Sequence, residues 1–404
     1  DVYIMKFTRD MLKLTKEYKL INAFEYYLLT NNIFQIRNLI NINTITGYHV
    51  SLISSIEMLD ILRDYINNVD TNGYTALIHA VHNDNKDLAQ ILLSHPNIDI
   101  NKHDSNGHTA LMRAVIYENV DITQLLLNDS KINVNVTDKP ENVRNTSIMD
   151  YSYTALMIAV SNSHTELTNL LLNHNDINVN ISNDTSGSAL MIAVQAGNIE
   201  LTNLLLNHKD IDVNIYNNMS GSALMIAIKE NHKELINLLL NHKDIDVNIK
   251  NVVDDTAIKM VIDDDDENDD LAKQLLDRDK IDVNIMSFMD NMTPLMSAVN
   301  KNYIKITTRL LKKEDIDVNF ISSDYDMTAL MIAIQEDHKE LTNLLLAHQK
   351  IDVNIVNDKG LSALTIAQSK NNKSLIEQLS RLGRSDTGDN ITNINILDLE
   401  RKEN

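Results

Sequence analysis

A block of small and apolar positions recurs along the chain at a nearly constant interval. Each copy begins with Thr or Ser, continues with Ala or Pro, and then has Leu or Ile. The copies begin at Thr75, Thr109, Thr154, Ser188, Ser222, Thr256, Thr293, Thr328 and Ser362. Successive spacings are 34, 45, 34, 34, 34, 37, 35 and 34 residues, which a unit of 34 residues with three lengthened copies explains.

One full unit, residues 186–219, predicts two helices and an extended segment. Ser188 is placed to cap the first helix, and small and branched apolar residues follow it. The leucines of residues 201–206 recur at helical spacing and predict the apolar face of the second helix. Residues 211–215 are β-branched and predict an extended segment. A unit of this size cannot bury its own apolar face, so neighbouring units must stack.

These residues resemble the ankyrin repeat. The shared features are the Thr-Pro-Leu-His-x-Ala helix start, the leucine-rich second helix and the Asp-Val-Asn segment before the next hairpin. Asp70, Gly73 and Thr75 also match the hairpin turn of the family. The resemblance covers about residues 66–383 in nine copies, and it implies an all-α repeat solenoid of helix-turn-helix units linked by β-hairpin loops. In style the sequence is similar to the ankyrin arrays of giant DNA viruses or other AT-rich genomes.

Three departures from the family pattern carry structural expectations. The unit has 34 residues, whereas the family's unit has about 33. The glycine that commonly follows the second helix is missing, so Asn or His is expected to take a left-handed conformation there. Met or Ile mostly replaces the histidine of the helix start, and we expect the Met residues that follow Leu to fill gaps in the core.

The regions outside the pattern define the expected domains. Residues 1–65 are predicted to form a helical N-terminal cap of degenerate repeats, with a separate small helical domain as the alternative. The array spans residues 66–383, and residues 384–404 form a polar C-terminal tail. The spacing of 45 places an insertion of 11 residues between Val134 and Thr154. The other lengthened copies add residues in two hairpins and in the acidic turn near residue 265.

Charge and composition exclude several classes of function. The net charge is -21 and the pI about 4.9, so the surface repels nucleic-acid backbones and anionic membranes. Cysteine is absent, and no apolar run approaches the ~18 residues of a membrane span. We therefore expect an intracellular, cytoplasmic monomer that binds neither nucleic acid nor membrane, within a host cell if the source is viral.

No residue cluster predicts catalysis, a metal site or a cofactor. Histidines such as His164 and His174 recur ten residues apart, but they occupy turn positions that the repeat fixes, so turn and capping roles are expected. The acidic run Asp263–Asp270 lacks the ligand pattern of a calcium loop and is interpreted as a solvated loop, with a basic partner or cations as the alternative. Phosphate-binding, dinucleotide-binding and hydrolase motifs are absent, so we do not expect an enzyme.

Binding residues are expected where the 34-residue count fails, at residues 136–153, 286–292 and 320–327. Two lengthened hairpin tips place aromatic residues and Met where solvent is expected, and exposed aromatic clusters often anchor partners. The alternative is that Phe288 and Tyr325 fold back onto the next hairpin. The insertion tip is the second candidate site. The predicted partner-binding residues are Phe288, Met289, Asp290, Tyr325, Asp326, Tyr151 and Tyr153.

Three functions follow as hypotheses. The resemblance implies a protein–protein interaction scaffold or adaptor that binds through hairpin tips and the concave face of the first helices. The alternative is a ubiquitin-ligase substrate adaptor in which residues 1–65 recruit the ligase, although no F-box or BTB motif is recognisable there. A third hypothesis makes the array a substrate of asparagine hydroxylation at Asn214, Asn248 and Asn354, whose surroundings are similar to the hydroxylation motif of ankyrin repeats.

Overall fold

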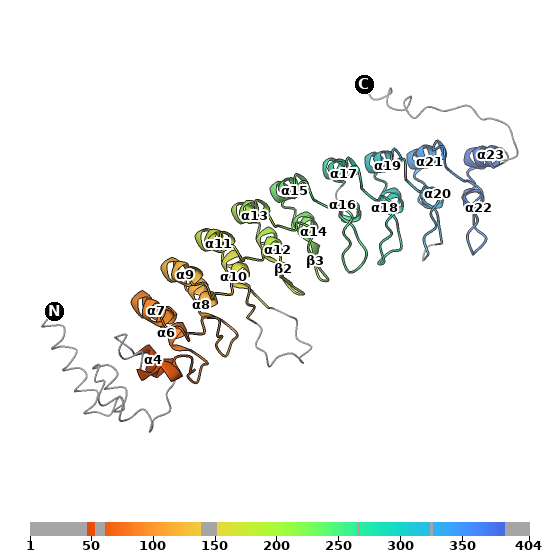
Figure 1. Ribbon diagram of the computed structural model, residues 1–404. Coiled ribbons are helices and arrows are strands. Elements are labelled where there is room, and N and C mark those ends of the chain that lie inside the picture. Colours follow the sequence, from red (N-terminus) through yellow and green to blue (C-terminus); the bar gives the residue numbers. More distant parts are fainter. Residues whose placement is uncertain (1–46, 53–60, 139–151, 265–266, 324–325, 384–404) are drawn as a thin grey trace. The chain divides into compact units, whose positions relative to one another are not determined.

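The computed structural model of the protein describes residues 47–52, 61–138, 152–264, 267–323 and 326–383. The chain divides into two compact units, Asp1–Ile215 and Tyr216–Asn404. Within each unit the helices form successive pairs, and a loop leads from each pair to the next (Figure 1). The chain therefore has the predicted fold, an all-α repeat solenoid.

The described part of the first unit holds four complete helix pairs. Its first helices have seven residues and its second helices eight. The pairs are α6 (Ala76–His82) with α7 (Lys86–Leu93), α8 (Ala110–Ile116) with α9 (Val120–Leu127), α10 (Ala155–Ser161) with α11 (Thr165–Leu172), and α12 (Ala189–Gln195) with α13 (Ile199–Leu206). The remaining elements are α4 (Gly47–Ser51), which packs against α6, the 3-10 helix η1 (Arg63–Tyr65), and the antiparallel strands β1 (Ser182–Asn183) and β2 (Gly187–Ser188).

The second unit continues the same pattern with five helix pairs. It opens with the antiparallel strands β3 (Tyr216–Asn217) and β4 (Gly221–Ser222). The pairs are α14 (Ala223–Lys229) with α15 (Lys233–Leu240), α16 (Ala257–Asp263) with α17 (Asp269–Leu276), α18 (Pro294–Asn300) with α19 (Ile304–Leu310), α20 (Ala329–Gln335) with α21 (Lys339–Leu346), and α22 (Ala363–Ser369) with α23 (Lys373–Leu382).

The lengthened copies keep their helices and extend only the connections. In the acidic copy the second helix begins at Asp269, two residues later relative to Ala257 than Lys233 is to Ala223 in the preceding pair. The other additions lie between a second helix and the next first helix. Extra residues are tolerated there because the helices, and not the loops, carry the buried apolar faces.

Local sequence accounts for the helix starts and for the core. Ser188 caps α12 as predicted, because its Oγ accepts a hydrogen bond from the backbone N–H of Met191 at 3.4 Å. Most first helices have the same cap, whereas Thr256 makes no such bond. The Met residues after Leu fill the core, as predicted. Four of them are at most 1% exposed, namely Met157, Met191, Met225 and Met331.

The left-handed residue lies at a different turn from the one predicted. Asn207, which follows a second helix, is right-handed with φ -82° and ψ -7°. The left-handed position is in the turn between the two helices, at Gly197 with φ 67° and at non-glycine residues such as Asn231 with φ 54°. That turn ends the first helix abruptly, and the N–H of Asn198 bonds back to the carbonyl of Ala193, five residues earlier.

Asparagine side chains bridge neighbouring repeats within each unit. In the first unit Asn135 Nδ2 donates to the carbonyl of Asp176 at 2.7 Å, and its Oδ1 accepts from the N–H of Asn178 at 2.8 Å. In the second unit Asn248 makes the equivalent bonds at 2.7 and 2.8 Å, so its amide, a predicted hydroxylation position, is engaged in stacking. The bridge from Asn135 crosses the insertion, so the repeats on both sides of it stack normally.

The predicted N-terminal cap lies mostly outside the described residues. Of residues 1–65 the structure describes 47–52 and 61–65, where Val50 and Leu62 are buried. The assignment of this region as a cap or as a recruiting module stays a prediction, as does the mobile-tail interpretation of residues 384–404, which also lie outside the described part.

Candidate functional site

Exposed large hydrophobic side chains of the second unit gather on its hairpins. Among the described residues of this unit, each such side chain lies in a segment between a second helix and the next first helix. In Figure 1 these segments hang from the same side of the unit. We call this set the hairpin row: Tyr216, Met219, Val252, Phe288, Met289, Ile321, Val356 and Leu361.

The tip at residues 286–292 presents the most exposed pair of the row. Phe288 is 71% exposed and Met289 is 70% exposed, so neither folds back onto a neighbouring hairpin. The backbone below them is fixed, because the N–H of Phe288 donates to the carbonyl of Val253 at 2.7 Å. Buried Ser287 accepts the N–H of Met289 at 3.2 Å. Two apolar side chains therefore project into solvent from an ordered backbone.

A buried lysine anchors the same tip from the preceding helix pair. Lys259 of α16 is 1% exposed and occupies the position that Met225 and Met331 fill in other repeats. Its Nζ donates to Asp290 Oδ2 at 2.8 Å and also to Asp263. Burial alone lowers the pKa of Lys259, but the bonds to the two carboxylates outweigh burial and raise it, so the side chain is charged.

Replacing this lysine by the methionine of the other repeats should loosen the tip. We expect Lys259→Met to destabilise the protein by about 1–2 kcal/mol, because two carboxylates then face each other without a cation. The loss is discounted because the side chains of Asp263 and Asp290 are 38% and 31% exposed and therefore partly screened. Urea unfolding measures the loss, and faster amide hydrogen exchange at Phe288 reports the loosened tip.

The matched control for this prediction is the double variant Lys259→Met with Asp290→Asn. It removes one of the two facing carboxylates, so we expect it to recover most of the lost stability. A Lys259→Met protein that is as stable as the wild type would show that the lysine does not anchor the tip.

The second lengthened tip is only partly within the described residues. Tyr325 lies outside them, whereas Asp326 adopts a left-handed conformation with φ 55°. Asp326 faces the following hairpin, because its carbonyl accepts from Asn357 Nδ2 at 2.5 Å and its Oδ1 accepts from the N–H of Asp358 at 3.3 Å. Asp326 thus links hairpins, and its role in binding stays a prediction.

The insertion in the first unit is described only at its base. Tyr151 lies outside the described residues. The hydroxyl of Tyr153 is 2.7 Å from Ser186 Oγ on the next hairpin, and its backbone N–H donates to Asp138 Oδ1 at 2.6 Å. Tyr153 therefore closes the base of the insertion, which differs from the exposed position expected for it.

The acidic run is not simply a solvated loop, because two of its members form ion pairs. Asp263 bonds to Lys259, as described above. Asp269 binds Arg309 of α19 through two hydrogen bonds of 2.7 and 3.0 Å, and these bonds lower the pKa of the Asp269 carboxyl. Lys301 also donates to the carbonyls of this turn. The basic partner that the run was predicted to hold as an alternative is thus the following repeat of the same chain.

The recurring histidines serve turns, as expected, but not all of them cap helices. His208 and His242 follow second helices, and their Nδ1 atoms accept backbone N–H groups two residues later at 3.3 Å. His232 and His338 stand at the starts of second helices and make no side-chain capping bond. Within the described part of the chain, no three His, Asp or Glu side chains converge on a possible metal position.

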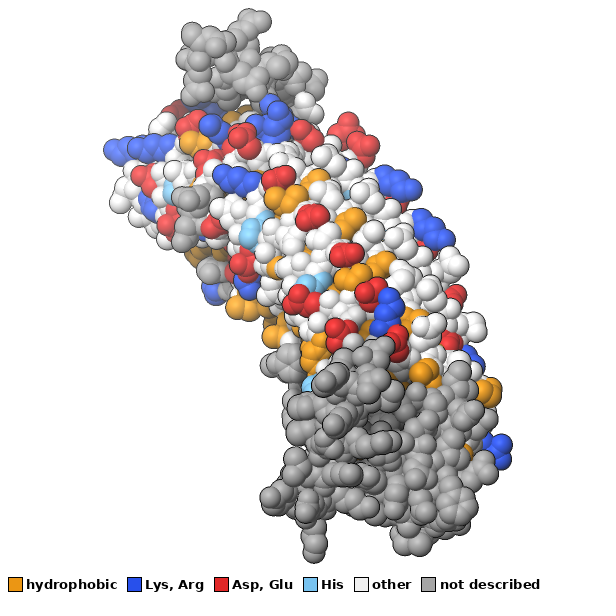
Figure 2. All heavy atoms as spheres, turned by 90° about the vertical axis from the view of Figure 1, so that its left-hand side faces the viewer, with side chains coloured by type: hydrophobic (Ala, Val, Ile, Leu, Met, Phe, Trp, Pro, Cys, Tyr) orange, Lys and Arg blue, Asp and Glu red, His pale blue; other side chains and the backbone are white. Residues whose placement is uncertain are grey.

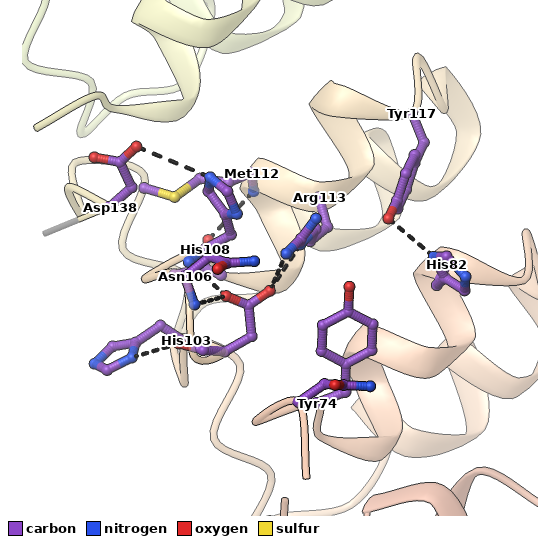
Figure 3. A network of polar contacts seen from close by, with 12 residues as sticks. Tyr74, His82, His103, Asn106, His108, Met112, Arg113, Tyr117 and Asp138 are labelled. Carbon is purple, nitrogen blue, oxygen red and sulfur yellow. Dashed lines mark hydrogen bonds and ion pairs between the residues drawn. The ribbon is translucent and has the colours of Figure 1, made fainter. Parts of the chain in front are cut away.

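Sequence reasoning did not find a polar network in the first unit (Figure 3). Arg113 Nε donates to Asp104 Oδ2 at 2.7 Å, and its guanidinium lies 5.3 Å from the centre of the Tyr74 ring. His82 Nδ1 is 2.9 Å from the hydroxyl of Tyr117, on the next repeat. The available signal was the ionisable residue at a helix position where Ile192 and other repeats have isoleucine.

Two half-buried histidines near this network predict a loss of stability in mild acid. Burial lowers the pKa of His79, although Asp70 lies 3.0 Å from its Nε2, and burial followed by Arg113 lowers the pKa of His108. The folded chain therefore binds these protons more weakly than the unfolded chain, whose histidine pKa is about 6.5. Their contribution to stability is present above that pH and is lost as the pH falls toward the depressed folded-state values, so we expect a lower urea midpoint at about pH 5.5 than at about pH 7.5.

The control for the pH prediction borrows residues from other repeats. One variant combines His79→Ile and Asp70→Asn, the pair found at Ile192 and Asn183. We expect this variant to lose part of the pH dependence of its unfolding free energy. An unchanged pH dependence would rule out His79 as a contributor.

The visible surface outside the hairpin row shows no other large apolar area. On the face in Figure 2, hydrophobic side chains form small patches among acidic, basic and neutral ones. Among the helices that the structure describes, none combines the length and the apolar composition needed to cross a membrane.

Stacked helix pairs, hairpin tips with exposed side chains and bridging asparagines define a repeat scaffold. A sequence model of the family described as "Ankyrin repeats (3 copies)" matches residues 48–138, 140–217, 156–251 and 258–357. Since these matches cover most of the chain, the protein belongs to the ankyrin repeat family. Repeats of this family are in general protein–protein interaction modules, and they are typically scaffolds without enzymatic activity.

Solved structures with a similar fold include two ankyrin repeat proteins. The ankyrin repeat domain of Bcl-3, described as a unique member of the IkappaB protein family, is 18% identical over 59% of this chain and 93% of that chain, with a TM-score of 0.44. The ankyrin repeat protein EF0377 is 23% identical over 46% of this chain and 89% of that chain, with a TM-score of 0.38. No curated protein sequence matches the chain.

Proposed function

We propose that this protein is an interaction scaffold or adaptor that binds a protein partner through the hairpin row of its second unit. The observation that carries the proposal is the placement of exposed large hydrophobic side chains on successive hairpins of this unit. Exposed apolar groups on an ordered backbone lose little conformational freedom on binding, so they suit an anchoring role. Phe288 and Met289 form the centre of the proposed site.

The fixed backbone of the central tip supports this assignment. Hydrogen bonds to Val253 and Ser287 hold the tip below the two exposed side chains, and Lys259 holds Asp290 beside them. An aromatic side chain on such a support can enter a pocket of a partner without reorganising the scaffold.

The test compares partner recovery by the wild type and by the double variant Phe288→Ser with Met289→Ser. Full-length protein is expressed with an affinity tag in its native cell, and captured proteins are quantified by mass spectrometry. We expect the principal partner to fall by about 10-fold or more, as for the loss of a binding hot spot. The thermal unfolding curve should not change, because both side chains are exposed.

The matched control is Ile199→Ser, which removes an exposed hydrophobic side chain from a helix of the first unit. It should leave the recovery of the partner unchanged. Equal recovery by the wild type and the Phe288/Met289 variant would contradict the proposed site.

A further inference from the structure

The hairpin row repeats at the interval of the helix pairs. Neighbouring hairpins touch each other: the N–H of Phe288 donates to the carbonyl of Val253, and Asn357 donates to the carbonyl of Asp326. A methyl group added at Gly221 would lie 3.3 Å from Cβ of Asn251, so the first two hairpins of the unit are also adjacent. Because packed helices lie ~8–10 Å apart, exposed side chains recur along the row at about that step.

Few chain conformations present side chains along one edge at this step. A β-strand turns alternate residues to opposite faces, so its same-face spacings are ~6.6 Å and ~13 Å, and neither fits. Two turns of an α-helix advance ~10.8 Å, and over the four steps from Tyr216 to Val356 the excess accumulates to several ångströms. A polyproline II helix has three residues per turn and rises ~3.1 Å per residue, so every third side chain lies on one edge ~9.3 Å apart.

The charge of the row favours a basic occupant. The described hairpin residues of the second unit carry five carboxylates and two amines. Asp254 and Asp358 are exposed at the tips, beside Val252 and Val356 of the row. These charged residues are Asp254, Asp255, Asp290, Asp326 and Asp358 against Lys250 and Lys359. The whole chain has a net charge of -21, which attracts a basic partner and repels an acidic one.

We infer that the hairpin row binds a basic polyproline II segment of its partner, with an apolar residue at every third position. The inference rests on the proposed function and specifies the conformation and charge of the bound segment. A segment of about 13 residues spans the five hairpins, because three residues advance one step. The two residues between successive apolar positions are free to carry lysine or arginine toward Asp254 and Asp358.

The test uses the full-length protein and synthetic fluorescein-labelled peptides of about 15 residues. The first peptide repeats Leu-Pro-Lys. A second has the same composition with its leucines moved out of the three-residue period, a third replaces each Lys by Glu, and a fourth is a basic helix-forming peptide with leucines seven residues apart. Binding is measured by fluorescence anisotropy at about 0.15 M salt.

We expect the Leu-Pro-Lys peptide to bind at least about 10-fold more tightly than the permuted and the acidic peptides. Phe288→Ser with Met289→Ser should weaken its binding by a similar factor, and Val252→Ser should weaken it less, with Ile199→Ser as the unaffected control. Tighter binding of the helical peptide, equal binding of the permuted peptide, or no binding of any peptide would overturn the inference.

These outcomes are distinct from failure of the proposed function. If the Phe288/Met289 variant loses the cellular partner while the peptides fail to discriminate, the row is an interaction site for a different kind of surface. If the partner is still captured by the variant, the proposed site itself is wrong.

Discussion

Replacing Arg113 by isoleucine should destabilise the protein by about 3 kcal/mol, because it leaves a buried carboxylate without its cation. The side chain of Asp104 is 0% exposed and that of Arg113 is 10% exposed. Removing one partner of such a pair typically costs about 3–5 kcal/mol. The lower end is expected here because Asp104 Oδ1 still accepts the N–H groups of Asn106 and His108 at 2.8 and 3.1 Å.

The same chain supplies the compensating change. Where the helix position is Ile192 or Ile226, the hairpin position equivalent to Asp104 is asparagine, Asn183 or Asn217. Asn183 accepts hairpin N–H groups through its Oδ1 without needing a cation. Adding Asp104→Asn to Arg113→Ile should therefore restore stability to within about 1 kcal/mol of the wild type.

Urea unfolding of the wild type, the two single variants and the double variant gives the coupling energy directly. Hydrogen exchange at the amides of α8 localises the effect to this repeat, which matters because repeat arrays can unfold in parts. A double variant as unstable as Arg113→Ile alone would show that the ion pair is not the source of the loss.

The second large effect is expected at Gly107. Its φ of 85° is left-handed, and an added Cβ would lie 1.9 Å from the carbonyl oxygen of Asp138. Gly107→Ala therefore combines conformational strain of about 1–2 kcal/mol with displacement of the next hairpin, for a total of about 3 kcal/mol.

Gly360 offers a matched comparison in the second unit. Its φ is 75°, but an added Cβ meets no atom within 4 Å. Gly360→Ala should cost only the strain, about 1–2 kcal/mol. Urea midpoints of the two variants measure the difference, and equal losses would mean that the close approach of Gly107 to Asp138 does not constrain the array.

Both predictions concern hairpins, and the hairpins also separate what sequence reasoning found from what it missed. The lengthened tip with Phe288 and Met289 stood out because its residue count departs from the 34-residue unit. The exposure of Tyr216, Val252 and Val356 did not stand out, because those hairpins have the standard length. A residue count detects an altered loop, but it does not show which side chains an unaltered loop leaves uncovered.

The charged residues show the same division. Lys259 looked like an ordinary surface residue in the sequence, since lysine is seldom fully buried. Its Nζ is satisfied by Asp290, 31 residues later, and by Asp263, so only the next repeat makes its burial tolerable. Similarly, the acidic run near Asp269 looked solvated until Arg309 of the following pair was placed against it.

The sequence by itself determined the helix pairs, the N-caps such as Ser188, the burial of the Met positions and the location of every lengthened copy in a connection. These features follow from local propensity and from the apolar period, and both are complete within one repeat. Only the tertiary structure decided which turn is left-handed, that Lys259 lies under the tip, and that Phe288 points into solvent. Each of these depends on what the neighbouring repeat places against a residue, and a linear pattern does not contain the contacts between repeats.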